Sequence, residues 1–308
     1  MRRLGARVGR RVRFGRRAFV LCRRYEDTFI GDGTKLGDRT LITVGSLQTG
    51  EDVRFDSEVR VRGRGSLRVG NGCYVGAHSY IDVNCDVVLE DDAGVGPGSW
   101  IFTHSVWQSV LEGGPRRFAP VRIQRQAWIP ACVFIMPGVT IGENAIVGAR
   151  SLVVSDIPPG VLAAGTPARV LKTAEERKAE RPDPDARKEI AAKVLEEFAK
   201  IAIERRVAES FDFKPGTGVQ IYKFEARGRT KAILAYCPGR LSTSQLATAE
   251  ASTWVALDGV DSEAIERLGK RAWFDVEARK RSDNWDSFNE LLHEVFRGEF
   301  GVRFRVAK

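Results

Sequence analysis

The sequence lacks several features that would assign it to a familiar class. No apolar run approaches the roughly 20 residues that a membrane-spanning helix needs, and no apolar segment follows the arginine-rich start as in a secretory signal. The five cysteines form no CxxC pair and no metal-ligand spacing, and histidine occurs only three times in 308 residues. We therefore expect a soluble cytoplasmic protein with reduced cysteines and no bound metal.

Acidic residues are absent from the first 24 positions, which hold ten arginines, and the whole chain has a net charge of +9. A cationic segment of this kind can contact an anionic membrane or an acidic glycan. The chain has no RRM, zinc-finger or helix-turn-helix pattern, so we expect no specific nucleic-acid recognition. The inner face of the membrane is thus a candidate peripheral contact.

A six-residue repeat dominates the first half of the chain. From Ile123 the sequence reads IQRQAW–IPACVF–IMPGVT–IGENAI–VGARSL–V, with an aliphatic residue at every sixth position and a small or short residue four positions after it. The same rule holds at Ile30/Thr34, Leu36/Thr40, Val69/Cys73, Val75/Ser79, Ile81/Cys85, Leu89/Ala93 and Val95/Ser99.

A period of six fits neither a helix nor a simple alternating strand. It fits a parallel sheet coiled into a prism of three flat faces, with roughly 18 residues in each coil. The aliphatic residues would fill the axis and the small residues would fit the crowded corners. Such coils need stacked neighbours to bury their hydrophobic columns.

The repeat resembles that of the hexapeptide-repeat family, whose fold is the left-handed parallel β-helix, and the resemblance covers residues 5–172. Residues 128–172 are similar to the last coils of sugar O-acetyltransferases of the maltose, galactoside and nodulation type, and DIPPGVLAAGTPARVLK is the most specific motif. The left-handed crossover is implied by the resemblance alone, because general strand-connection rules predict a right-handed one. The chain departs from the family at Gln124 and Pro130, where glycine often follows the isoleucine.

The resemblance implies acetyl-CoA as the acetyl donor, bound in a groove between neighbouring subunits of a homotrimer. Carried over position by position, the cofactor-binding residues are Ala131 and Ala149 at the pantetheine arm, Thr166 and Pro167 at the adenine, and Arg169 and Lys172 at the phosphates. Two cations three residues apart also suit a ligand with several negative charges.

The hexads break between residues 103 and 120, THSVWQSVLEGGPRRFAP. Loops that interrupt a solenoid lie on its outside and often build the site. His104 begins this loop, in the place where the resembling enzymes have their catalytic histidine. The resemblance therefore implies that His104 is the general base that takes the proton of a sugar hydroxyl during attack on the acetyl thioester. The sequence does not identify the partner that orients the imidazole or the donor to the oxyanion.

Other residues are candidates for binding the acceptor. Asn84 matches a position where related enzymes place a polar residue against the acceptor sugar, and Asp82 could assist it; turn chemistry at a coil corner accounts for both equally well. In the loop, Trp107, Arg116 and Arg117 could stack on or hydrogen-bond a saccharide, including an acidic one, although ordinary loop residues need no such role.

The composition changes after residue 172. Residues 173–210 predict a charged helical linker, interrupted at RPDPD. Residues 211–308 predict a small α+β accessory domain of unknown role that resembles no family, with a hairpin near Gly228. The expected fold class is thus mainly β: a left-handed β-helix acyltransferase domain over residues 1–172, then the linker and the α+β domain.

We expect an acetyl-CoA-dependent O-acetyltransferase that acts on a saccharide hydroxyl in cell-surface glycan or glycolipid synthesis. One alternative is transfer to an amine of an amino sugar, a nucleotide-linked sugar or an antibiotic. Another is a non-catalytic β-helix scaffold or binding module. A β-helix carbonic anhydrase would need three zinc-binding histidines, but only His78 and His104 fall in this region; His78 and His293 are interpreted as structural.

Overall fold

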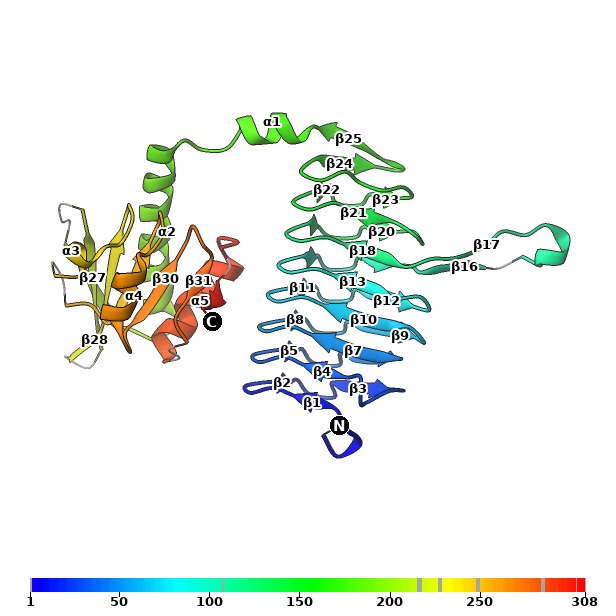
Figure 1. Cartoon of the computed structure of the whole chain (residues 1–308), viewed down its shortest axis with the longest axis horizontal. Coiled ribbons are helices and arrows are strands. Elements are labelled where there is room, and N and C mark those ends of the chain that lie inside the picture. The colour runs from blue at the N-terminus through cyan, green and yellow to red at the C-terminus, as the bar shows by residue number, and fades with distance from the viewer. Residues whose placement is uncertain are drawn as a thin grey trace. The chain divides into compact units, whose positions relative to one another are not determined.

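The computed structural model describes residues 2–106, 108–214, 218–226, 229–247, 250–283, 286–302 and 304–307. The chain divides into two compact units, Met1–Arg181 and Pro182–Lys308 (Figure 1). The boundary falls within the segment that was expected to be a linker, and each unit is described by itself.

Unit 1 is a prism of three sheets, because each coil of the chain adds one strand to each face (Figure 1). The strands of each sheet are parallel except for the last pair of the second sheet. The first sheet contains β1 (Arg7–Val8), β4 (Phe29–Ile30), β7 (Ser46–Thr49), β10 (Ser66–Val69), β13 (Val87–Leu89), β18 (Val121–Ile123) and β21 (Thr140–Ile141). The second contains β2 (Arg13–Phe14), β5 (Lys35–Leu36), β8 (Arg54–Phe55), β11 (Tyr74–Val75), β14 (Gly94–Val95), β19 (Trp128–Ile129), β22 (Ile146–Val147), β24 (Leu162–Gly165) and β25 (Ala168–Lys172). The third contains β3 (Phe19–Cys22), β6 (Leu41–Val44), β9 (Arg60–Gly63), β12 (Tyr80–Val83), β15 (Trp100–Ile101), β20 (Phe134–Ile135) and β23 (Leu152–Val153). The predicted left-handed β-helix is confirmed.

The core of the prism consists of aliphatic columns. In the second sheet, Leu36, Phe55, Val75, Val95 and Ile129 stack in register, and each is at most 2% exposed. Burying a side chain of this size stabilises the fold by about 1.5–3 kcal/mol. The small residues expected at the corners are also buried, among them Thr34, Thr40, Cys73, Ser79, Ala93 and Ser99.

The corner between the third and first sheets departs from the strict hexad. Ile81 and Leu89, both buried, lie eight positions apart instead of six, so the chain makes a wider turn between them. Cys85, which the repeat assigned to a crowded corner, is for this reason partly exposed. The spacing of six returns at Ile135 and Ile141.

The break in the hexads is an antiparallel hairpin that projects sideways from the prism (Figure 1). Strand β16 (His104–Val106) pairs with β17 (Arg116–Phe118), and a short 3-10 turn, Val110–Glu112, lies between them. The register opposes His104 to Phe118. The hairpin leaves the prism at the same corner that is widened in the coils before it.

The C-terminal end of the prism is covered by an antiparallel pair, β24 and β25, followed by α1 (Ala174–Ala179). Thr173 and Glu176 form a capping box that satisfies backbone N–H groups at the start of α1. The guanidinium of Arg177 donates to the carbonyl oxygens of Asn144 and Gly160 at 2.7 and 2.6 Å. These bonds fix α1 to the last coils.

Unit 2 is a sheet with helices on both faces. Its strand order is β26 (Ser210–Lys214), β27 (Gln220–Ala226), β28 (Arg229–Cys237), β29 (Thr253–Ala256), β30 (Ala272–Asp275), β31 (Lys280–Arg281) and β32 (Arg305–Val306). Helices α2 (Pro184–Glu204) and α5 (Ser287–Gly298) pack on one face, and α3 (Thr243–Leu246) and α4 (Ser262–Leu268) on the other. The expected α+β architecture is confirmed, although the turn at Gly228 lies outside the described residues. No helix in the described part of the chain is long and apolar enough to cross a membrane.

Candidate active site

His104 lies where the third sheet ends at the widened corner. Strand β15 directs Ile101 to the axis, after which the chain buries Thr103 and leaves His104 partly exposed at the start of the hairpin. One coil away, β12 pairs with β15, and Ile81 lies opposite Ile101. This register places the residues after Ile81 beside those after Ile101.

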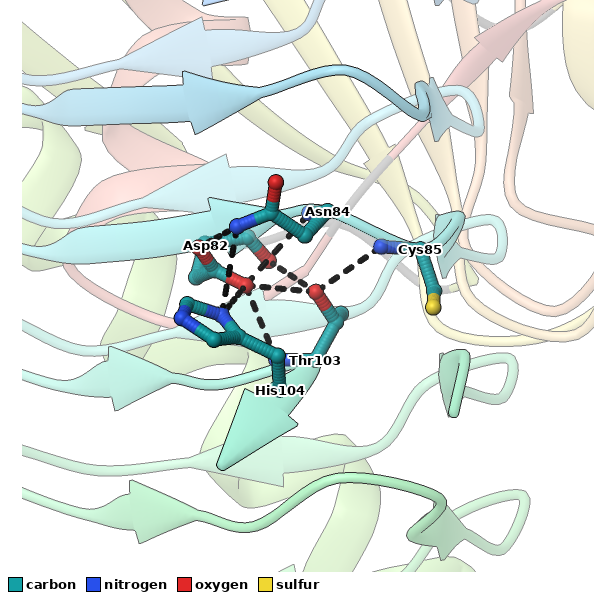
Figure 2. A network of polar contacts seen from close by, with 5 residues as sticks. All are labelled: Asp82, Asn84, Cys85, Thr103 and His104. Carbon is teal, nitrogen blue, oxygen red and sulfur yellow. Dashed lines mark hydrogen bonds and ion pairs between the residues drawn. The ribbon is translucent and has the colours of Figure 1, made fainter. Parts of the chain in front are cut away.

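Asp82 is the centre of a polar network at this corner (Figure 2). Nδ1 of His104 lies 2.8 Å from Asp82 Oδ1, and the hydroxyl of Thr103 donates to the same oxygen at 2.6 Å. The side-chain amide of Asn84 donates to Asp82 Oδ2 at 2.8 Å. The structure thus brings His104, which the sequence nominated as the base, together with Asp82 and Asn84, which it nominated for the acceptor.

The network determines which nitrogen of the imidazole can accept a proton. The Asp82 side chain is 4% exposed, and a carboxylate can only accept hydrogen bonds, so Nδ1 of His104 carries the proton that it donates. In the neutral imidazole the lone pair is then on Nε2. The His104 side chain is 36% exposed, so the imidazole is accessible to a ligand.

Asp82 is held in its ionised form. Burial acts to raise the pKa of this carboxyl, but the hydrogen bonds from Thr103 and His104 outweigh burial, and the pKa lies below its ordinary value. The backbone N–H of Cys85 donates to Thr103 Oγ1 at 3.0 Å, which leaves the hydroxyl proton of Thr103 for Asp82. The buried charge is therefore compensated from several directions.

The hairpin supplies one face of the site. The ring of Phe118 stacks on His104 with centroids 5.5 Å apart, and the guanidinium of Arg116 lies 4.9 Å from the Phe118 centroid. Arg117 opposes Ser105 and therefore points to the other face of the hairpin. The structure thus brings Arg116 but not Arg117 to the side of His104, and Trp107 lies outside the described residues.

The other histidines lie away from this network. His78 occupies an exposed turn beside Glu58, at 3.3 Å, and His293 is buried in α5 of unit 2. In the part of the chain that the structure describes, no three His, Cys, Asp or Glu residues gather in a way that could hold a metal ion.

The residues implied for the cofactor lie along a different corner. Ala131 and Ala149 occupy the turns between the second and third sheets in consecutive coils, where the N–H of Arg150 donates to the carbonyl oxygen of Ala131 at 3.1 Å. Exposed Thr166 and Pro167 form the turn between β24 and β25 in the next coil. The small side chains leave an open, linear edge with turns about 4.8 Å apart.

A β-bulge aligns the two cations expected at the phosphates. Residues three apart in a regular strand point to opposite faces. Here the register shifts, so that Arg169 opposes Ala164 while Lys172 opposes Leu162. Ala164 and Leu162 are two apart, and the cations therefore lie on the same, outer face of the sheet. Lys172 also forms an ion pair with Glu180.

The comparisons with known proteins give the family. No family model matches the chain. A putative acetyltransferase of Schizosaccharomyces pombe is 30% identical over 165 residues, which are 50% of this chain and 79% of that protein. The galactoside O-acetyltransferase of Escherichia coli K12 is 34% identical over 116 residues, or 35% of this chain and 57% of the enzyme. A hexapeptide-repeat acetyltransferase of Vibrio cholerae, solved with acetyl coenzyme A, is 23% identical with a TM-score of 0.35, covering 47% of this chain and 70% of that one.

The prism with its interrupting hairpin thus defines a β-helix protein, and its relatives in S. pombe and E. coli place it among acetyltransferases. The match across four fifths of the S. pombe protein is more specific, and the chain belongs to the hexapeptide-repeat acetyltransferase family. It spans little more than half the length of the E. coli relative.

Sequence reasoning missed two residues of the site. Thr103 is fully buried beside Asp82, and Phe118 covers the imidazole. Thr103 directly precedes His104, and Phe118 follows two arginines in the same interruption, but only the hairpin register relates Phe118 to His104.

Proposed function

We propose that this protein transfers an acetyl group from acetyl-CoA to the hydroxyl of a saccharide, with His104 as general base. The observation that carries this proposal is the 2.8 Å contact between His104 Nδ1 and Asp82 Oδ1, which leaves Nε2 to accept a proton. The proposed acceptor is a cell-surface glycan or a glycolipid.

In the proposed reaction, Nε2 of His104 takes the proton of the acceptor hydroxyl while its oxygen forms a C–O bond to the acetyl carbon. The C–S bond breaks, and the proton passes from His104 to the departing thiolate. The ionised Asp82 stabilises the imidazolium between these two transfers. Positioned base catalysis is worth about 10²–10⁴-fold, or roughly 3–5 kcal/mol.

A hydroxyl acceptor suits an oriented base better than an amine does. A hydroxyl becomes a good nucleophile only as its proton leaves, whereas an unprotonated amine attacks a thioester without prior loss of a proton. Asn84 lies beside the imidazole and is partly exposed, so it can also bind the acceptor. Arg116, near Phe118, would favour an acidic saccharide.

The C-terminal coils suit the elongated, anionic acetyl donor. The turns of Ala131 and Ala149 would lie along the pantetheine arm, and Thr166 and Pro167 beside the adenine. The aligned cations Arg169 and Lys172 would bind the phosphates. When bound, acetyl-CoA supplies an already activated acyl group, so the chain needs only to position it and handle the proton.

A homotrimer would complete the site. His104 and the Ala131 turn lie at different corners, separated along the third sheet by about six residues, or roughly 20 Å. Within one prism, His104 and the expected cofactor-binding turns lie on different edges. In a trimer, the His104 edge of one subunit can face the cofactor-binding edge of its neighbour. We therefore propose active sites shared between subunits, in a protein of the cytoplasm whose arginine-rich first coil contacts an acidic glycan or the inner membrane face.

The test is acetyl transfer to a panel of sugars and amino sugars, followed by the release of free thiol. The wild type should acetylate a sugar hydroxyl, and His104→Ala should lose about 10²–10⁴-fold in rate. Equal rates for the two proteins would refute the general-base role, and transfer only to amino sugars would favour N-acetylation. No transfer to any acceptor by a folded protein that binds CoA would support a non-catalytic module.

A further inference from the structure

The N-terminal end of the prism exposes the end of its hydrophobic core. Phe14 opposes Leu36, which is 2% exposed within the core, so both side chains point toward the axis. Phe14 belongs to the terminal coil and is 45% exposed. The short 3-10 turn η1 (Arg2–Leu4) precedes this coil, next to the end marked N in Figure 1. Its Leu4 is 60% exposed. The end face therefore has an apolar centre.

Arginine pairs surround this centre at all three corners of the terminal coil. They are Arg10–Arg11 after β1, Arg16–Arg17 after β2 and Arg23–Arg24 after β3. In each pair one arginine is held by a nearby acid, through Arg10–Asp32, Arg16–Asp38 and Arg24–Asp27. The side chains of Arg17 and Arg23 form no ion pair with any residue that the structure describes.

The net charge of the chain is concentrated in the first coils of the prism, beginning with the terminal coil. Residues 1–70 contain 17 lysines and arginines against 8 acids, so they carry the whole net charge of +9. The remaining 238 residues have 32 of each sign. Such segregation produces a strong positive potential at one end of the prism.

We propose that this end face is a docking surface for an anionic lipid bilayer. A bilayer offers negative headgroups to the arginine rim and an apolar layer to Leu4 and Phe14, which is the pattern of interfacial membrane anchors. A second copy docked end to end would oppose two faces of the same charge. A soluble acidic polymer would satisfy the arginines but not the apolar centre. This proposal narrows the contact of the arginine-rich first coil given under the proposed function to a lipid bilayer, and it is independent of the acetyl transfer.

The test is sedimentation of the full chain with vesicles of phosphatidylcholine alone or with about one third phosphatidylglycerol. We expect binding to the anionic vesicles only. Each arginine at the surface contributes about fivefold in affinity. A variant with Arg3→Ala, which removes an exposed arginine of η1, and with Arg17→Ala and Arg23→Ala at two corners should therefore bind on the order of a hundredfold more weakly.

The matched control carries Arg60→Ala, Arg62→Ala and Arg64→Ala, three exposed arginines on the side of the prism. This control variant loses the same three positive charges as the first triple variant, and it should retain most of the wild-type binding to anionic vesicles.

Leu4→Ser tests the contribution of the apolar centre, because it replaces an exposed apolar side chain and leaves the buried core residues unchanged. It should weaken vesicle binding severalfold and leave binding to a soluble sulfated polysaccharide unchanged. Equal losses in the two triple variants, or no preference for anionic vesicles, would overturn the proposal. Binding to the polysaccharide that matches vesicle binding, with no effect of Leu4→Ser on either, would assign the face to an acidic polymer instead. An end-to-end dimer that the first triple variant abolishes would assign it to a second copy.

Discussion

Substitution of Asp82 tests the proposed base most directly, because this carboxylate both fixes the proton on His104 Nδ1 and balances the imidazolium charge. Asp82→Ala removes both effects. In Asp82→Asn, the amide oxygen should keep the place of Oδ1, because the hydroxyl and the N–H of Thr103 both donate there, at 2.6 and 3.3 Å. The asparagine variant therefore retains the acceptor for Nδ1, but it loses the charge and the Oδ2 acceptor of the Asn84 amide.

The expected magnitudes follow from this difference. A hydrogen bond to a charged group is worth about 1.5–3 kcal/mol and a neutral one about 1 kcal/mol, so Asp82→Asn should lose on the order of tenfold in turnover. Asp82→Ala should lose about 10²–10³-fold, approaching His104→Ala, since the freed imidazole can rotate. The double variant Asp82→Ala/His104→Ala should be no slower than His104→Ala alone, because residues that act as a unit are not additive.

The assay is thiol release at saturating acetyl-CoA with the acceptor identified by the panel, and circular dichroism melting verifies the fold of each variant. The KM for acetyl-CoA should not change, because Asp82 lies at a different corner from the expected cofactor edge. A fully active Asp82→Ala variant would refute the dyad. So would a double variant whose loss equals the product of the two single losses.

Three further predictions concern stability, the cofactor and assembly. Because folding lowers the pKa of Asp82, its stabilisation is present above the ordinary carboxyl pKa and is lost as the pH falls through the folded value. The free energies of urea unfolding of wild type and Asp82→Asn should therefore differ by about 2 kcal/mol at pH 7 and converge once the pH lies below the folded pKa of Asp82; a difference that stays constant with pH would contradict this assignment. Glu180→Gln should lower the KM for acetyl-CoA severalfold at low salt by releasing Lys172 for the phosphates, and an unchanged KM would remove Lys172 from the site. Coexpressed His104→Ala and Arg169→Glu subunits should recover about a quarter of wild-type activity if each site combines residues of two subunits, whereas no recovery would place each site within one chain.

The prism could be predicted from sequence because each hexad constrains its own face. Ile123, Ile129 and Ile135 fall on three successive faces, and every one is fully buried. This signal is local, since a coil needs only its neighbours to bury its aliphatic residues. The α+β unit has no such repeat. There, the sequence predicted the α+β class and the hairpin near Gly228, whereas no pattern predicted the brief helix α3 (Thr243–Leu246) or the strand β26 (Ser210–Lys214).

The candidate site was only partly predictable, because it depends on contacts between coils. Asp82 was nominated for the acceptor, yet it contacts a histidine 22 positions later. That contact depends on the number of residues in the coil, and the wide corner between Ile81 and Leu89 makes this number larger than the regular hexads predict. The eight-residue gap was visible as a break in the hexads and could have indicated the corner. The bulge that aligns Arg169 with Lys172 gave no comparable signal.

The number of stacked coils sets the distance between the His104 corner and the N-terminal end of the prism. The third sheet passes from β3 through β6, β9 and β12 to β15, so the His104 corner lies four coil steps, or about 19 Å, above the terminal coil. Each coil contacts mainly its two neighbours, so a coil can be gained or lost below β12 without altering Asp82 or His104. If His104 is the base proposed above, the prism would act as a spacer whose length changes in steps of about 4.8 Å with the number of coils.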